Sequence, residues 1–550
     1  MRRYASFVIA GLCGLAVASS SPARDAVTSA PALFRVELGS QSSQPASGRL
    51  LLFAVDAKTA RAAAKDGKVE EVDTNPFKPS ETAIAAREVT HLAPGQGITM
   101  DADAVAFPKA FSQLPPGDYL LQAVLDTHHD YNYHGRDAGD VVSPVIEAHL
   151  PGAMPRLVLD KVLPERGLWD FPKGALSPAT EKHLADAKAH LKPIDFVSPA
   201  LSAFWGRPIH MKGWVLLPPG YDASGKTTYP VVYHTHGFGG SDRSEAATGL
   251  MAYGQMAEKA MPPMIWVLLD ESSATGTHEF ADSVNNGPWG EALTTELIPS
   301  LEKQYRMDGK ASGRFLNGHS SGGWATLWLQ TRYPKVFGGT WSTSPDPSDF
   351  HDFTGPDLYA PHANVYHRAD GTAYPLVRDK GKVYATFEQF AKMERVLGPY
   401  GGQMASFDWV FSPRGQDGRP MPMFDRDTGD VDPSVVAYWH DHYDIAHRLK
   451  TNWPALKPDL DGKIHLYVGT ADTFYLDGAA HRLKAVLDGL GAKSSFHFLP
   501  NRTRSHAPVR SNRSKPRLDR PRTDTAATVG ATSVAMPFRS DAPCEQEHRG

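Results

Sequence analysis

The pattern of apolar and polar positions divides the chain into two parts with different periodicities. From about residue 32 to 160, apolar residues alternate with polar ones over 33–38 or form short runs such as 50–55, and turn residues at 115–118 lead into the apolar stretch 119–125. Alternation with period two and short apolar runs bounded by turns are typical of β-strands. Residues 32–160 are therefore predicted to form a small all-β domain with a sandwich-like architecture.

From about residue 205 onward, short apolar stretches alternate with helical patterns. The predicted strands cover 214–217, 230–234, 264–269, 313–316, 339–342, 464–468 and 495–499, and the predicted helices cover 290–305, 321–333 and 478–490. Strands that alternate with helices form a mostly parallel sheet covered on both faces, so residues 205–503 are predicted to form an α/β domain. The interval from about 346 to 462 is too long for one connection, and we expect a cap inserted over the carboxyl edge of the sheet. Residues 161–204 are expected to be a linker with one polar helix at 178–191.

Both ends of the chain differ from this pattern. Arg2 and Arg3 precede an apolar run over 7–17, and an A-x-A sequence at 16–18 ends it. These features predict a signal peptide over residues 1–18 and a secreted or periplasmic protein, with an uncleaved N-terminal anchor as the alternative. Residues 504–550 are rich in Arg, Pro, Ser, Thr and Ala and predict a disordered basic tail, or an arm for anionic partners.

Composition excludes several classes of protein. Of the 550 residues, 41% are hydrophobic and 21% are charged, which is the balance of a globular protein with a packed core. The net charge of -4 argues against a nucleic-acid partner, which would require a basic face. No later stretch has the roughly 18 consecutive apolar residues of a membrane-spanning helix. Of the two cysteines, Cys13 and Cys544, only the second remains after removal of the signal, so no internal disulfide is expected.

The candidate chemistry lies in the stretch FLNGHSSGGW at 315–324. It contains G-x-S-x-G between a predicted strand and a predicted helix, which is the context of a nucleophile elbow. The flanking positions must be glycine because the strand and helix backbones nearly touch there. Ser320 has Gly318 and Gly322 two positions before and after it, whereas Ser321 would have a histidine at the first of these positions. Ser320 is therefore the candidate nucleophile, and Ser321 offers its backbone N–H to an oxyanion.

A second oxyanion donor is expected from an earlier loop. The predicted strand at 230–234 runs into the sequence THGFGG at 235–240. Glycines allow the backbone to approach a tetrahedral intermediate closely. The backbone N–H of Phe238 is the candidate donor, and a simple flexible turn is the alternative.

The chain from about Trp205 to Thr503 resembles the putative-esterase branch of the α/β-hydrolase superfamily. This branch includes enterochelin esterases, esterase D-like enzymes, feruloyl and acetyl xylan esterases, and mycolyltransferases. The matching stretches are TYPVVYHTHGFGG, GEALTTELIPSLEKQYR and GRFLNGHSSGGWATLWLQTRYPKVFGG. The resemblance implies an α/β-hydrolase fold, a catalytic triad in the chain order Ser, Asp, His, and no metal or other cofactor.

The acid and the base of such a triad would follow the last two predicted strands. Asp472 follows the strand at 464–468 in a G-x-x-D sequence, which places its carboxylate at the carboxyl edge of the sheet, and the acid of the family lies at the matching place. Asp346, after the preceding strand, is the alternative acid, and Asp472 would then be a helix cap or turn residue. His506 is the only histidine in reach after the strand at 495–499 and is the candidate base. The composition changes at residue 504, which suggests a replaced native C-terminus and a chain without a working base.

Two other clusters are spaced like metal ligands. His440, Asp444 and His447 fall on one face of a predicted helix, which we interpret as a solvated or substrate-facing surface of the cap rather than a metal site. Four aspartates have the spacing of a calcium loop but lack the glycine and distal glutamate of an EF-hand: Asp425, Asp427, Asp430 and Asp432. We therefore expect no metal site.

Together these features predict a secreted or periplasmic serine esterase that hydrolyses a carboxylic ester of a small molecule or a glycan. Ser320 would attack the ester carbonyl, His506 would accept and return the proton, and Asp472 would orient the imidazole. An acyltransferase of the same fold is one alternative. The other is a binding protein for a glycan or siderophore without a working catalytic site.

Overall fold

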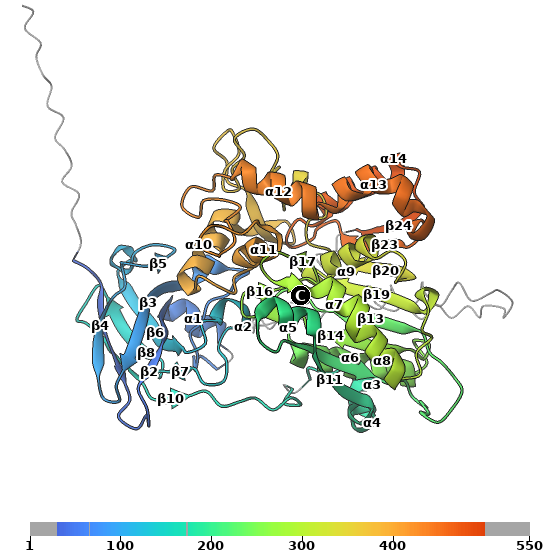
Figure 1. Cartoon of the computed structure of the whole chain (residues 1–550). Coiled ribbons are helices and arrows are strands. Elements are labelled where there is room, and N and C mark those ends of the chain that lie inside the picture. The colour runs from blue at the N-terminus through green and yellow to red at the C-terminus, as the bar shows by residue number, and fades with distance from the viewer. Residues whose placement is uncertain (1–29, 65, 172–173, 501–550) are drawn as a thin grey trace, which may run out of the picture.

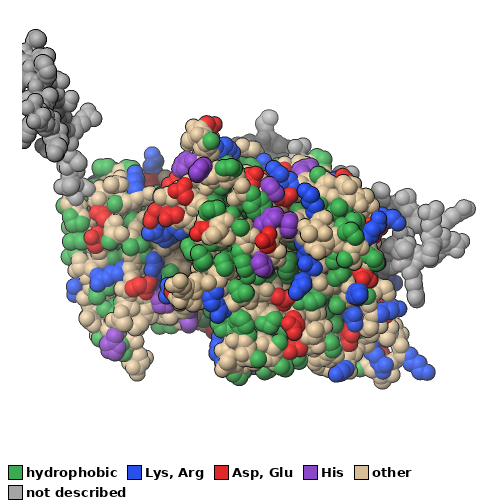
Figure 2. Space-filling model, turned by 45° about the horizontal axis from the view of Figure 1, so that its top comes forward, with side chains coloured by type: hydrophobic (Ala, Val, Ile, Leu, Met, Phe, Trp, Pro, Cys, Tyr) green, Lys and Arg blue, Asp and Glu red, His purple; other side chains and the backbone are tan. Residues whose placement is uncertain are grey.

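The computed structural model describes residues 30–500, apart from 65 and 172–173. The predicted signal peptide, the tail with His506, and both cysteines lie outside these residues. Figure 1 shows a strand-rich N-terminal part beside a larger α/β part. Within the described ranges, no helix combines the length and apolar character that crossing a membrane requires. On the face drawn in Figure 2, acidic and basic side chains are interspersed rather than separated by sign.

The N-terminal part consists of two sheets that share a buried core. The smaller sheet has the strand order β4-β1-β9, and the larger has the order β10-β7-β6-β2-β3-β5, with β8 paired to β6. Their bounds are β1 (Leu33–Leu38), β2 (Ala46–Asp56), β3 (Ala83–Leu92), β4 (Gly97–Asp101), β5 (Ala106–Phe107), β6 (Gly117–Asp126), β7 (Val141–Val142), β8 (Ile146–Leu150), β9 (Arg156–Leu159) and β10 (Lys161–Val162). Two short helices, α1 (Ala57–Ala63) and α2 (Tyr131–His134), lie between strands. The predicted sandwich-like architecture is confirmed.

The burial of β2 explains its apolar run. Leu50 and Leu52 belong to the core shared by the two sheets, whereas Leu51 and Phe53 belong to a second core on the opposite face. That second core includes residues of α10 (Phe387–Leu397), a helix of the cap. The N-terminal part therefore packs against the cap through its larger sheet.

The α/β part is built on a sheet with the order β11-β12-β14-β13-β19-β20-β23-β24. Strand β12 is antiparallel to both of its neighbours, and the other pairs are parallel. The bounds are β11 (Leu191–Val197), β12 (His210–Leu216), β13 (Val231–Thr235), β14 (Ile265–Leu269), β19 (Arg314–His319), β20 (Gly339–Thr343), β23 (Ile464–Gly469) and β24 (Ser494–Leu499). Every strand predicted after residue 205 lies in this sheet, so the predicted α/β-hydrolase fold is confirmed.

One edge strand comes from the segment predicted as a linker. Strand β11 pairs with β12 along its whole length. The predicted helix at 178–191 is instead two short helices, α3 (Pro178–Lys182) and α4 (Leu184–His190). In β11 only Leu191 and Ile194 are buried, so this edge strand lacks both the alternation and the apolar run that identify a strand in a sequence. The linker prediction is wrong for these residues.

Helices cover both faces of the sheet (Figure 1). One face packs against α5 (Pro199–Trp205), α7 (Trp289–Ala292) and α8 (Ile298–Gln304), and the other packs against α4 and α6 (Asp242–Ala257). Within β13, Val231 and Tyr233 face the first group and Val232 faces α6. A strand buried on both faces is mostly apolar, and the run from Val231 to Tyr233 makes β13 detectable in the sequence.

The interval between β20 and β23 forms the expected cap. It contains β21 (Pro375–Asp379), β22 (Lys382–Thr386), α10, α11 (Gln403–Phe411), α12 (Pro433–Tyr443) and α13 (Ile445–Leu460). Phe411 of α11 packs between Trp324 of α9 (Ser321–Arg332) and Trp439 of α12, with ring centroids 4.7 and 5.1 Å away. The cap therefore shares one core with the sheet, and α13 packs against α9 and α14 (Asp477–Gly489).

Candidate active site

Ser320 lies on the sharp turn between β19 and α9. Its backbone has φ 57° and ψ −123°, a conformation that is strained for a residue with a side chain. The backbone N–H of Ser320 donates to Thr343 in β20 at 3.0 Å, which anchors the turn to the neighbouring strand. The side chain of Ser320 is half-buried. A strained serine between a strand and a helix is the geometry expected of a nucleophile elbow.

The two glycines of the motif are required by close backbone contacts. A Cβ atom on Gly318 would lie 2.2 Å from the carbonyl oxygen of Gly322. A Cβ atom on Gly322 would lie 2.2 Å from the carbonyl oxygen of His236. These contacts agree with the spacing argument that favours Ser320. Ser321 is fully buried in the first turn of α9.

Four predicted or alternative site residues follow the carboxyl ends of four neighbouring strands, at one edge of the sheet. Strands β13, β19, β20 and β23 are parallel and adjacent in this order. They are followed by Phe238, Ser320, Asp346 and Asp472, respectively. The carboxyl ends of parallel strands meet at one edge, where ligands of open α/β sheets bind. The next strand in the sheet is β24; His506 comes after it in the sequence and lies outside the described residues.

The loop after β13 lies directly beside Ser320. A Cβ atom on Gly237 would lie 3.0 Å from both the Cβ of Ser320 and the carbonyl oxygen of His319. At the start of this loop, the buried ring of His236 pairs with Asp270 at 3.0 Å. Burial alone would lower the pKa of His236, but the hydrogen bond to Asp270 and the neighbouring carboxylates raise it to about 9. The buried contact between His236 and Asp270 therefore anchors the loop that carries Phe238.

Asp346, the alternative acid, contacts both serines. The hydroxyl of Ser320 donates to its Oδ1 at 3.2 Å, and the hydroxyl of Ser321 donates to its Oδ2 at 2.7 Å. The carboxylate is buried, and burial raises its pKa to about 6, although these hydrogen bonds oppose the shift. In the described part of the chain, the Ser320 hydroxyl contacts this carboxylate and no histidine.

Asp472 is buried in the turn between β23 and α14. Its Oδ1 accepts hydrogen bonds from the backbone N–H groups of Phe474 at 2.9 Å and Leu476 at 3.3 Å. These contacts are typical of a turn residue, which is the alternative to a role as the triad acid. Burial raises the pKa of Asp472 to about 6. The assignment of Asp472 as the triad acid stays a prediction that rests on its place at the sheet edge.

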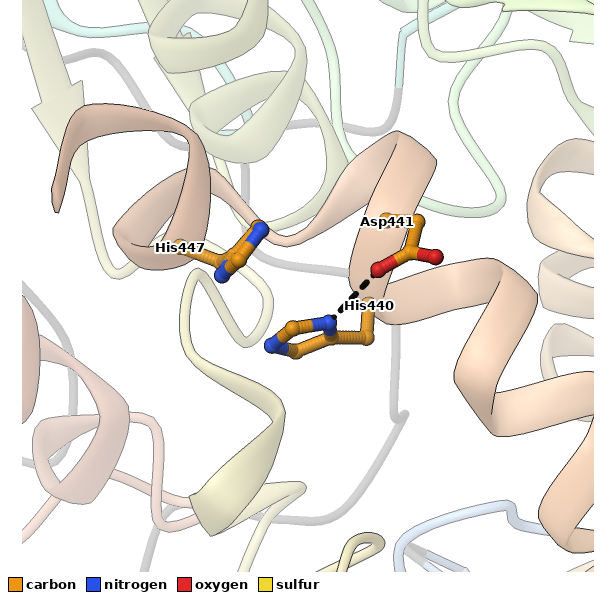
Figure 3. Close-up of side chains that lie close together, drawn as sticks. All are labelled: His440, Asp441 and His447. Carbon is orange, nitrogen blue, oxygen red and sulfur yellow. Dashed lines mark hydrogen bonds and ion pairs between the residues drawn. The ribbon is translucent and has the colours of Figure 1, made fainter. Parts of the chain in front are cut away.

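The histidine cluster of the cap differs from the predicted trio. Figure 3 shows His440, Asp441 and His447, whose nearest ligand atoms all lie within 4.8 Å of one another. The Nδ1 of His440 bonds Asp441 at 2.9 Å. Asp444, predicted to join the two histidines, instead caps α13 and accepts the N–H of His447 at 2.8 Å.

The four aspartates that resemble a calcium loop have separate structural partners. Asp425 accepts the N–H groups of Asp427 and Thr428 at 2.7 and 2.9 Å. Asp427 pairs with Arg395, and Asp432 caps α12. Asp430 accepts hydrogen bonds from the hydroxyl of Thr428 in the same turn and from the side-chain amide of Asn364. Turn and cap formation explains their spacing.

Comparisons with known proteins identify relatives of the α/β part. Residues 206–486 match the family model described as "Putative esterase". Esterase Rv1288 of Mycobacterium tuberculosis is 32% identical over 148 residues, which are 26% of this chain and 31% of that protein. The chain therefore matches less than a third of the length of this curated relative.

Solved structures with a similar α/β part have low sequence identity. A ferulic acid esterase of Anaeromyces mucronatus is 14% identical to this chain. The alignment covers 57% of this chain and 83% of the esterase, with a TM-score of 0.31. An S-formylglutathione hydrolase of Agrobacterium tumefaciens is also 14% identical. The alignment covers 57% of this chain and 87% of the hydrolase, with a TM-score of 0.32.

Proposed function

Because this chain belongs to the Putative esterase family, we propose that it is a serine esterase that forms an acyl-enzyme on Ser320. The observation that carries the proposal is the strained backbone of Ser320 at φ 57° between β19 and α9. Strain of this kind is kept where function requires it. Further support comes from the loop after β13, which approaches Ser320 closely enough to exclude a side chain at Gly237.

The proposed reaction has two steps. Ser320 Oγ attacks the carbonyl carbon of the ester while a base removes its proton, and the negative oxygen of the tetrahedral intermediate accepts hydrogen bonds from the N–H groups of Phe238 and Ser321. Collapse of the intermediate breaks the ester C–O bond, and the alcohol leaves with the proton. Water then attacks the acyl-enzyme by the same route and releases the carboxylic acid. His506 is the proposed base, and Asp472 is proposed to orient it.

The location and the substrate class belong to the same proposal. The sequence of residues 1–18 supports export to the periplasm or the medium. We propose a carboxylic ester of a small molecule or a glycan as the substrate. The cap above the sheet edge supports a shielded site, since its core is continuous with that of the sheet.

The test compares Ser320→Ala with Ser321→Ala by turnover of p-nitrophenyl acetate. Ser320→Ala removes the proposed nucleophile and should abolish turnover. Ser321→Ala keeps the backbone N–H and removes only the hydrogen bond to Asp346, so it should retain much of the activity. Equal losses in the two variants would overturn the assignment. No ester turnover and no burst in the intact chain would favour the binding protein instead.

A further inference from the structure

A tyrosine of the N-terminal β-domain reaches the loop after β13. Tyr133 of α2 donates its hydroxyl hydrogen to the carbonyl oxygen of Gly240 at 2.9 Å. Its ring meets the ring of Phe238 edge-on, with centroids 5.0 Å apart. Tyr133 is buried, and burial together with nearby carboxylates holds its pKa well above the ordinary value, so the hydroxyl remains a donor. One side chain of the β-domain thus contacts both Phe238 and Gly240.

The turn that carries Tyr133 is itself fixed by the cap. The side-chain amide of Asn132 donates to the carbonyl oxygens of Glu394 and Gly398, both at 2.8 Å, at the end of α10. The guanidinium of Arg49 in β2 donates to the carbonyl oxygen of Val396 at 2.7 Å. The bonds of Asn132 tie α2 to the cap, and the bond of Arg49 ties β2 to the same end of α10. Tyr133 therefore extends from a fixed support.

A second anchor lies at the start of the loop after β13. His236 pairs with Asp270 at the start of the loop. At the far end, Gly240 lies over the His236 ring so closely that a Cβ atom there would be 2.4 Å from its Nδ1. The N–H of Gly240 also donates to Gly237 at 3.0 Å, which closes the turn. Phe238 lies between the two anchors.

We propose that Tyr133 is a positioning residue of the esterase site, through which the N-terminal β-domain holds the N–H of Phe238 in place for the oxyanion. This inference rests on the proposed function, because it assigns Phe238 to the oxyanion hole. An oxyanion donor acts only if it is fixed before charge develops, and small displacements of reacting groups reduce rates steeply. The β-domain is then a part of the active site rather than a separate module joined to it.

The experiment uses the full chain with Tyr133→Phe and the control Tyr131→Phe. Tyr131 belongs to the same short helix, is equally buried, and donates its hydroxyl hydrogen to Asp73 within the β-domain. Both substitutions remove one buried hydroxyl, but only the first touches the loop after β13. We measure kcat and KM for p-nitrophenyl acetate, the inhibition constant of a boronic acid that binds as a tetrahedral adduct, and the melting temperature.

Tyr133→Phe should lower kcat about tenfold or more and weaken boronic acid binding by a similar factor, with little change in KM. Tyr131→Phe should leave kcat and boronic acid binding near those of the wild type, whatever its melting temperature. Equal effects of the two variants on kcat, or an unchanged kcat in Tyr133→Phe, would overturn the proposal. The proposal would also be overturned if a lower melting temperature fully accounted for the loss of kcat in Tyr133→Phe.

Ser320→Ala, measured in parallel, separates this inference from the proposed function. If Ser320→Ala is inactive and Tyr133→Phe has wild-type kcat, only the role of Tyr133 is rejected. If Ser320→Ala keeps its activity, the serine mechanism and the positioning role fall together.

Discussion

The Ser320 hydroxyl donates a hydrogen bond to Asp346 at 3.2 Å. The other oxygen of this carboxylate accepts the hydroxyl of Ser321 at 2.7 Å. In a catalytic triad the acid contacts the base and the base contacts the nucleophile, so an imidazole lies between the acid and the serine. In the described part of the chain, Asp346 contacts the serine directly, with no imidazole between them. We therefore keep Asp472 as the predicted triad acid and predict that Asp346 acts as a hydrogen-bond acceptor beneath the elbow.

The two aspartates are therefore expected to differ when each is changed to asparagine. Asp472→Asn should lower kcat by a factor on the order of 10⁴, because an amide would no longer hold the base in the required tautomer. Asp346→Asn keeps an oxygen that accepts from one serine and should cost less than about 10²-fold. Steady-state kinetics with p-nitrophenyl acetate measures both. A larger loss in Asp346→Asn would transfer the acid role to that residue.

Gly322→Ala should disrupt the elbow. The added Cβ would lie 2.2 Å from the carbonyl oxygen of His236 and 2.5 Å from that of Thr235, and both are backbone atoms that cannot move independently. We expect destabilisation of about 1–3 kcal/mol and loss of ester turnover. Gly489→Ala is the matched control, since nothing lies within 4 Å of its added Cβ at the end of α14. Chemical denaturation checks the difference, and equal stability of the two variants would contradict the close contact.

The sequence predicted those parts of the fold whose signal is local. Strand β13 is buried on both faces and reads as an apolar run, so its position was predictable within a residue or two. Helix α6 is buried along most of its length and has no amphipathic pattern, and it was not predicted. Strand β11 is an edge strand with only two buried positions and was assigned to a linker.

The same distinction holds at the candidate site. The glycine spacing around Ser320 is a local constraint, and the contacts of Gly318 and Gly322 agree with it. The contact between Tyr133 and Gly240 joins positions 107 residues apart in the sequence. No sequence pattern around Tyr133 distinguishes it from Tyr131. The contact with Gly240 forms only because the two domains pack against each other.

Glu394 should make the stability of the protein depend on pH. Its carboxylate accepts the N–H groups of Gln403 at 2.6 Å and Met404 at 3.1 Å at the start of α11, and burial raises its pKa to about 7. Between about pH 4.5 and 7 the unfolded chain loses this proton and the folded chain keeps it, so the free energy of unfolding falls as pH rises. Below about pH 4.5 both states are protonated and the full stability is present.

Glu394→Gln should remove this dependence. The free energy of unfolding of wild type minus that of the variant should fall between pH 4.5 and 7 by an amount on the order of 2–3 kcal/mol. Other buried carboxyls are present in both proteins and cancel in the difference. Denaturant titrations at several pH values give the comparison. A difference that stays constant or rises with pH would show that Glu394 is ionised throughout this range in the folded protein.

The last prediction concerns the base. His506 follows β24 in the sequence, and β24 is the strand next to the one that precedes Asp472. If His506 is the base, His506→Ala should lose about as much activity as Ser320→Ala, because triad members act as a unit. Truncation after Pro508 should then be tolerated, since no residue beyond it has a proposed role.

A replaced C-terminus gives a different result in the same measurement. The intact chain would then be nearly inactive, with only the residual rate that an oxyanion hole supplies, and His506→Ala would change nothing. Measuring the intact chain, His506→Ala and Ser320→Ala side by side separates the two cases. Full activity in both the intact chain and His506→Ala, with none in Ser320→Ala, would keep the serine mechanism and reject His506. The base would then have to be sought among the cap histidines His440, His442 and His447. The rings of His440 and His447 lie 3.8 Å apart at the junction of α12 and α13.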